Sequence, residues 1–276
     1  MASFTSSDEL RGATFHEVDL REAKFTDVTL RDATLREVSL RGARVTSADL
    51  SETVLRGVDV QDVEIDSPWL FDGDHYLRIN GVDVRAFVDA ELNRRFPGRE
   101  LRAADTPQGL RAAWDAVQRT WAATIERAGA MPAGTVEESV AGEWSFAQTL
   151  RHLVMATDVW LGRAILRKEN PYHPAGLPND DGGGETAAYT DTSVFSANAP
   201  SYDEVLAARA DRVGMVTEFL ASVTPEVLAE PRPNPHDPQY DETVLHCVHT
   251  ILDEHWEHHR YAVRDLDALS AGQASG

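Results

Sequence analysis

The histidines near the C-terminal end are the side chains in this sequence best suited to chemistry. Five of the ten histidines fall within fourteen residues, at His246, His249, His255, His258 and His259. Residues four apart on a helix share a face, so His255 and His259 could bind one metal ion together. His258 points roughly 100 degrees away from His259 and is not expected to join them. Such a pair predicts a metal site, although solvated or core histidines often have the same spacing.

A third ligand has to come from another helix, and His152 is the natural candidate. It lies in the segment Leu150-Arg151-His152-Leu153, where the apolar spacing indicates that His152 faces inward. A histidine inside a bundle can also be a core residue with both nitrogens satisfied. With three such histidines available, the metal site is the preferred interpretation.

Four amphipathic segments are expected to position these residues. Thr106-Pro107 is a typical helix start, and Ser145 with Gln148, like Ser201 with Glu204, forms a capping-box pattern. The last helix is predicted over residues 241–269. Together the segments predict a four-helix bundle over residues 106–276. The connection at about residues 170–200, with its glycine triplet, is long enough to be a pocket lid or a disordered loop.

The two histidine segments resemble the DinB-like superfamily of metal-binding four-helix bundles. The resemblance is carried by Glu143-Trp144-Ser145 with Leu150-Arg151-His152 on the second helix, and by His255-Trp256-Glu257-His258-His259-Arg260 on the fourth. It implies metal ligands at His152, His255 and His259. The family pattern gives no role to His246, His249 and His258.

The family includes metal-dependent thiol transferases and the mycothiol-dependent maleylpyruvate isomerase. The resemblance therefore implies an enzyme that uses Zn²⁺ or Ni²⁺ to activate a low-molecular-weight thiol, such as mycothiol, against an electrophile. Arg260 could bind an anionic thiol or substrate, although a cation near a helix C-terminus is favoured anyway. Cys247 is expected to be a buried structural thiol.

A second pattern occupies the N-terminal part of the chain. An apolar residue recurs every five residues from Leu10 to Leu70, and a smaller series from Ala13 to Val63 precedes it by two positions. A period of five fits neither a strand nor a helix. The chain is therefore expected to turn inward once per five residues and bury one large and one small side chain each time.

Residues 10–65 resemble the pentapeptide-repeat family. The resemblance implies a short right-handed quadrilateral β-helix, so that the expected fold class is multidomain β plus α, with this β-helix followed by the four-helix bundle. The predicted domains are 1–71 for the β-helix, 72–105 for a connecting segment and 106–276 for the bundle. The flat faces of the β-helix suggest an element that docks a protein partner or forms a homodimer contact.

Composition limits the classes of partner. The net charge of -20 argues against a surface that binds nucleic acid, and mimicry of DNA by the repeats is the less favoured alternative. A single cysteine excludes an internal disulfide, and the absence of a long apolar run or a signal-peptide pattern points to the cytoplasm without membrane contact. Two alternatives to an enzyme stay open: a non-catalytic metal-binding stress-response protein, and an interaction module that acts through the repeats.

Overall fold

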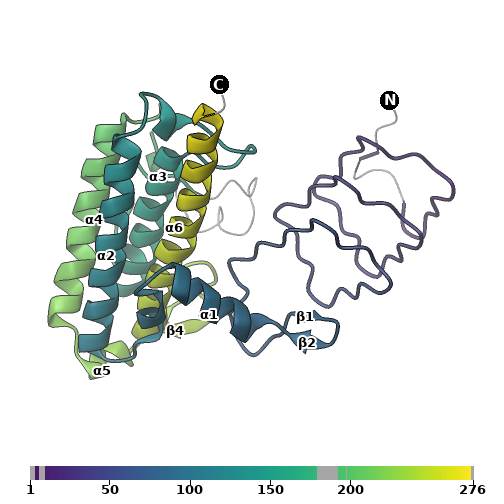
Figure 1. Cartoon of the computed structure of the whole chain (residues 1–276). Helices are drawn as coiled ribbons and strands as arrows, with labels where there is room; N and C mark the ends of the chain where they lie inside the picture. Colours follow the sequence, from purple (N-terminus) through teal and green to yellow (C-terminus); the bar gives the residue numbers. More distant parts are fainter. Residues whose placement is uncertain (1–3, 6–9, 179–191, 197, 275–276) are drawn as a thin grey trace. The chain divides into compact units, whose positions relative to one another are not determined.

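The computed structural model describes residues 4–5, 10–178, 192–196 and 198–274. The chain divides into two compact units, Met1–Val63 and Glu64–Gly276. The first holds the five-residue repeats and the second is mainly helical (Figure 1). Part of the long connection expected at residues 170–200, including its glycine triplet, lies outside the described residues.

The first unit is a series of regular turns. A positive φ recurs at every fifth residue from position 12 to position 62, at Gly12, Glu17, Glu22, Asp27, Asp32, Glu37, Gly42, Ser47, Glu52, Gly57 and Asp62. Backbone hydrogen bonds close alternate turns, as between Ala13 N and Leu10 O at 2.9 Å. The predicted period of five is thus present in the backbone conformation.

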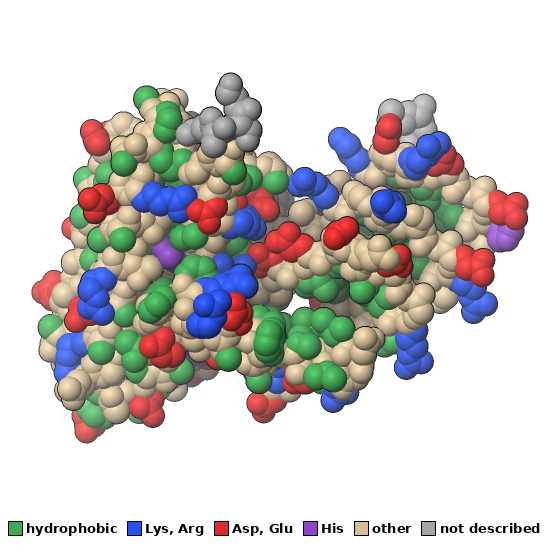
Figure 2. Space-filling model, viewed as in Figure 1, with side chains coloured by type: hydrophobic (Ala, Val, Ile, Leu, Met, Phe, Trp, Pro, Cys, Tyr) green, Lys and Arg blue, Asp and Glu red, His purple; other side chains and the backbone are tan. Residues whose placement is uncertain are grey.

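The expected strands and apolar core of this unit are not found in its described residues. No strand lies between residues 10 and 63, and the backbone bonds there join residues three apart within one turn. Ladder hydrogen bonds normally join the stacked coils of a solenoid, and the described residues of this unit form none. The large apolar residues remain exposed, from 43% for Leu10 to 68% for Val54, and hydrophobic side chains are visible at the surface of the unit (Figure 2).

The second unit is built on four long helices that lie side by side (Figure 1). They are α2 (Pro107–Gly129), α3 (Phe146–Thr157), α4 (Tyr202–Ser222) and α6 (Val244–Ala274). The predicted starts are confirmed: Thr106 caps α2, and Ser145 with Gln148 and Ser201 with Glu204 form complete capping boxes. These caps satisfy backbone N–H groups that a helix start leaves free.

The bundle core forms where α3 packs against α4 and α6, and where α2 packs against the same two helices. Its fully buried side chains include Leu110, Trp121, Leu153, Leu220 and Ile251. A π-helical segment, η3 (Asp158–Ile165), continues α3 and also contacts α6. The four helices therefore hold α3 and α6 side by side, which is the contact that matters for the site.

Short elements surround the bundle. They are β1 (Arg78–Ile79), β2 (Val82–Asp83), α1 (Arg85–Arg95), η1 (Arg99–Ala103), η2 (Thr135–Glu137), η5 (Thr192–Val194), α5 (Pro225–Leu228), β3 (Pro231–Pro233) and β4 (Asp241–Thr243). β1 pairs with β2 and β3 pairs with β4, both antiparallel.

The segment before α2 packs on the bundle. Arg99 of η1 is 2% exposed, and its guanidinium donates to Asp89 and Asn93, both at 2.7 Å. Arg102 pairs with Asp253 of α6 at 3.2 Å. α1 and η1 thereby form part of the second compact unit.

Among the described helices, none combines the length and the apolar character that crossing a lipid bilayer requires.

Candidate metal centre

His152 enters the site from the second turn of α3. The Ser145 capping box fixes the start of this helix, and almost every residue of α3 is buried. The His152 side chain is only 4% exposed, and its Nε2 lies 3.2 Å from Oε2 of Glu254 on α6. The packing of α3 on α6 thus places this imidazole against the facing helix.

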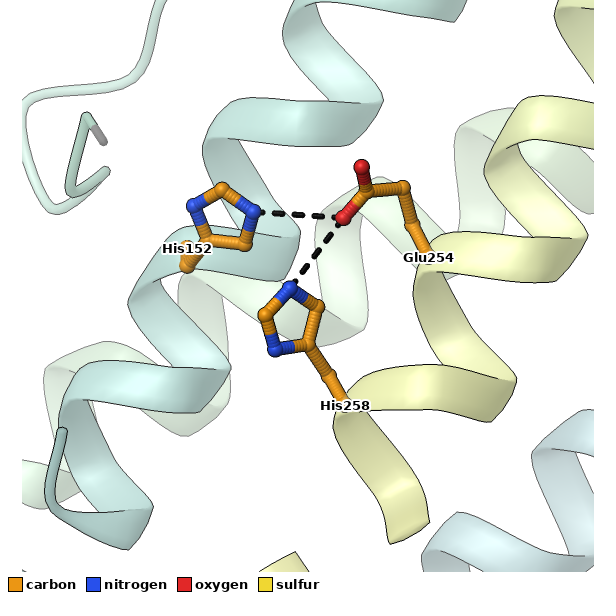
Figure 3. A group of neighbouring side chains, drawn as sticks. All are labelled: His152, Glu254 and His258. Atoms are coloured by element: carbon orange, nitrogen blue, oxygen red, sulfur yellow. Dashed lines mark hydrogen bonds and ion pairs between the residues drawn. The ribbon is translucent and has the colours of Figure 1, made fainter. Parts of the chain in front are cut away.

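Glu254 and His258 enter from one face of α6, four residues apart. Nε2 of His258 lies 3.2 Å from the same Glu254 oxygen that faces His152, and Figure 3 shows both rings pointing at that oxygen. The ligand atoms of His152, Glu254 and His258 all lie within 4.8 Å of one another. Within the part of the chain that the structure describes, no other three His, Cys, Asp or Glu side chains come together this closely.

The three groups interact strongly through their charges. Burial would raise the pKa of Glu254, but hydrogen bonds from His152 and His258 and their positive charge outweigh it, so that the pKa lies well below its usual range. Burial and the neighbouring His152 lower the pKa of His258, despite the bond to Glu254. A metal ion requires a deprotonated carboxylate and a neutral imidazole, and the lowered pKa values of Glu254 and His258 favour these forms.

The donor set fits a divalent metal. Two imidazole nitrogens and one carboxylate oxygen are ligands that Zn²⁺ and other transition-metal ions accept. Metal–ligand bonds of about 2.0–2.2 Å in a tetrahedral site place the ligand atoms about 3.3 Å apart. The 3.2 Å distances from Glu254 Oε2 to each Nε2 are close to that spacing.

The site is open on one side. Glu254 and His258 have side chains that are 31% and 16% exposed, so that solvent reaches two of the three ligands. Trp144 lies against both rings, with centroids 4.7 Å from His152 and 6.0 Å from His258. Tyr261 lies edge-on to His258 at 5.8 Å. Three protein ligands with an accessible remaining position are typical of catalytic rather than structural sites.

The structure does not bring the predicted set His152, His255 and His259 together. His255 Nδ1 bonds to Ile251 O at 2.9 Å, and its ring packs edge-on to Trp114. His259 Nε2 bonds to Thr124 Oγ1 at 2.8 Å. Both rings face α2 in the bundle interior, at 2% and 4% exposure.

Burial keeps these two histidines neutral. It lowers the pKa of His255 to about 3, with a further contribution from the charge of Arg209, and lowers the pKa of His259 to about 4. They are core side chains in this structure. The rotation of about 100 degrees per residue on a helix puts His258, and not His259, beside His152.

Arg260, predicted to bind an anionic thiol or substrate, is held by two carboxylates of the chain itself. Its guanidinium donates to Asp66 at 2.6 and 2.8 Å and to Glu257 at 2.8 Å. Arg264, one turn further, bonds to Glu143 and Asp265. No substrate group is needed to neutralise either arginine.

Four other titratable side chains of α6 are not part of this group. Cys247 is fully buried, as predicted, and burial raises the pKa of its thiol to about 11. His249 bonds to Ala104 O at 2.8 Å, and His246 lies 3.7 Å from Glu242. Asp253 pairs with Arg102. None of these four side chains is a member of the cluster.

Comparison with protein families accounts for both parts of the chain. Residues 84–262 match the family model described as the DinB superfamily. The chain belongs to the DinB superfamily. Residues 10–54 match the pentapeptide-repeat model in nine copies, so the fusion inferred from the sequence is confirmed. No curated protein and no solved structure matches the chain.

The DinB match begins at residue 84 and so includes α1 and η1 with the bundle. It also contains all three residues of the candidate site. The sequence analysis did not consider Glu254 as a ligand, and it set His258 aside because His258 does not share a helix face with His259. Glu254 and His258 have the same four-residue spacing as His255 and His259, and a search that allowed a carboxylate ligand would have found both pairs.

Proposed function

We propose that the DinB domain binds a divalent metal ion through His152, Glu254 and His258 and uses it to activate a low-molecular-weight thiol such as mycothiol. The thiolate would form a carbon–sulfur bond with an electrophilic carbon and displace a leaving group from it. In an isomerisation the thiolate would instead add to a carbon–carbon double bond and be released again after rotation about that bond. The convergence of three ligand atoms on one accessible point supports this proposal most directly. The donor set suits Zn²⁺ or Ni²⁺.

When bound, such an ion supplies the positive charge that stabilises a thiolate at neutral pH. The protein residues provide the rest. Glu254 contributes one negative charge, which limits the net charge of the occupied site. His152, fixed on a buried helix, holds its ring rigidly, while Trp144 covers both imidazoles and restricts water on that side. The exposed edges of Glu254 and His258 leave the approach for thiol and electrophile.

The test is spectroscopic and does not require the true electrophile. The Cys247→Ser variant, which lacks the protein's own thiol, is loaded with Co²⁺ and titrated with mycothiol. A sulfur-to-cobalt charge-transfer band should appear and saturate. The S-methyl derivative of mycothiol, which cannot form a thiolate, is the matched control and should give no such band.

Absence of the band in a protein that has taken up one equivalent of Co²⁺ would contradict thiol activation. It would leave a metal-binding protein without this chemistry. Failure to take up Co²⁺ at all would contradict the metal site itself.

For the repeats we propose the right-handed quadrilateral β-helix implied by their sequence, serving as a docking or homodimer element. The five-residue recurrence of positive φ and the row of exposed apolar side chains support this proposal. Such side chains are unfavourable in water and are stabilised by stacking. In the full chain, amides of residues 10–65 should then exchange slowly with deuterium. Exchange at the rate of an unfolded peptide would contradict a stacked coil.

A further inference from the structure

A buried arginine in the bundle has no counter-ion among the described residues. Arg209, on α4, is 8% exposed, and it forms no ion pair with any carboxylate of the described residues. Within the described part of the chain, Nη2 donates to Gln118 Oε1 at 3.4 Å, and Nε is buried without a partner. Burial lowers the pKa of Arg209 to about 10, which still leaves the guanidinium charged at neutral pH.

The other two buried arginines are satisfied differently. Arg99 pairs with Asp89 at 2.7 Å and also donates to Asn93. Arg151 donates to the carbonyl oxygens of Ala175 and Gly176, which belong to the segment that covers it. An unpaired buried charge is strongly destabilising, so the exception at Arg209 calls for an acceptor.

Two polar groups near Arg209 also lack partners among the described residues. Gln118 uses its oxygen for Arg209, and its Nε2 is buried without a partner. The Tyr202 hydroxyl, two helical turns before Arg209 on the same face of α4, is likewise buried and unpartnered. Burial raises the pKa of Tyr202, while the charge of Arg209 partly opposes this, so the phenol keeps its proton. Glu137 influences Tyr202 from η2 but does not pair with Arg209.

A guanidinium Nε–H, an amide N–H and a phenolic hydroxyl, all without an acceptor among the described residues, define what is missing. We infer that Arg209 and Gln118, with Tyr202 at the edge, form a binding site for a compact anion that bears a carboxylate or phosphate group. A guanidinium binds either group through two parallel hydrogen bonds. The inference goes beyond the proposed thiol chemistry and does not depend on a metal ion.

The site lies where α2 and α4 pack together. Gln118 of α2 and Tyr202 of α4 are partly exposed residues, although their unpartnered atoms are buried. The guanidinium of Arg209 lies over the ring of Trp121, with its central carbon 5.3 Å from the ring centroid. An anion that binds this guanidinium would reach it beside Gln118, which is partly exposed.

Thermal unfolding of the full, metal-free chain tests the inference. Acetate and inorganic phosphate are each compared with sodium chloride at equal ionic strength. The wild type should show a saturable rise in Tm of about 2–4 °C with at least one of the two anions. A larger response to acetate identifies a carboxylate ligand, and a larger response to phosphate identifies a phosphorylated one.

Two variants locate the effect. Gln118→Glu changes one atom and places a carboxylate beside Arg209, so it should raise Tm without added anion and abolish the response. Arg209→Gln should also abolish the response. Arg119→Gln, which removes an exposed charge from the adjacent position of α2, should respond as the wild type does.

The inference fails if the wild type responds to neither anion, or if Gln118→Glu keeps the full response. It also fails if Glu254→Gln removes the response, because the anion would then bind at the candidate metal centre. Metal content is measured separately, so a protein that binds acetate but no metal would contradict the proposed function and leave this inference standing.

Discussion

Glu254 and His258 lie one helical turn apart on α6, and Oε2 of the carboxylate is 3.2 Å from Nε2 of the imidazole. Oε2 of Glu254 is also 3.2 Å from His152 Nε2 on α3. One residue further along α6, His255 and His259 have the same spacing and face the bundle interior instead. The rotation of α6 about its axis therefore decides which of the two pairs lies beside His152.

Metal binding should be visible in the fluorescence of Trp144, because its ring lies 4.7 Å from His152. Titration with Ni²⁺ or Co²⁺, which quench nearby fluorophores, should lower the emission of the wild type until one equivalent is bound. Trp144→Phe should lose most of this change. Trp69→Phe, which removes a tryptophan that is 73% exposed, should keep it. Equal quenching in both variants would place the ion elsewhere.

The buried carboxylate of Asp158 should stabilise the bundle through Arg212. It is fully buried and accepts from Arg212 Nε at 2.6 Å and from His173 N at 2.8 Å. Asp158→Asn leaves Arg212 without its buried partner and should cost about 3–5 kcal/mol of the free energy of unfolding. Asp211→Asn removes the exposed partner of the same arginine and should cost about 0–1 kcal/mol. Urea unfolding of both variants, followed by circular dichroism, measures the difference, and similar losses would contradict the role of burial.

The pairing of Asp66 with α6 should make stability depend on pH. Burial alone would raise the pKa of Asp66, but hydrogen bonds from Arg260 and the charges of Arg260 and Arg264 outweigh it and lower the pKa. A carboxyl whose pKa is lower in the folded protein stabilises it above the unfolded value of about 3.9, and this contribution is lost as pH falls through the folded value.

Asp66→Asn should therefore cost about 1–2 kcal/mol at pH 7 and progressively less below about pH 4. Urea unfolding of wild type and variant across this range gives the comparison. Asp19→Asn is the control, since Asp19 pairs with Arg21 at a fully exposed position of the repeats. A loss for Asp66→Asn that does not change with pH would contradict the ion-pair explanation.

Local chemistry explains which parts of the fold could be predicted. Thr106, Ser145 and Ser201 act within one turn of their own helices, and all three caps were predicted from neighbouring residues. The candidate site was harder to predict, because the packing of α6 against α3 decides whether Glu254 and His258 or His255 and His259 face His152. The predicted histidine pair falls among the buried positions Ile251, Leu252, Trp256 and Ala262, which are continuous with the core.

That pattern held a signal for the pair that faces His152. Residues at the centre of an apolar stripe become core, whereas residues at its edge can reach both a neighbouring helix and solvent. Glu254 and His258 occupy the edge. The polar groups without partners around Arg209 could not be predicted from the sequence. They depend on the packing of Gln118 on α2 against Arg209 on α4, two residues that are 91 positions apart in the chain.

Metal content tests the candidate centre most directly, in a matched pair of adjacent variants. His258→Gln and His259→Gln, made in the full chain and purified without chelators or a histidine tag, carry the same substitution one residue apart. Plasma mass spectrometry after incubation with Zn²⁺ should find about one equivalent in the wild type and in His259→Gln, and little in His258→Gln, while circular dichroism shows that both are folded. Metal retained in His258→Gln and lost in His259→Gln would contradict the site formed by His152, Glu254 and His258.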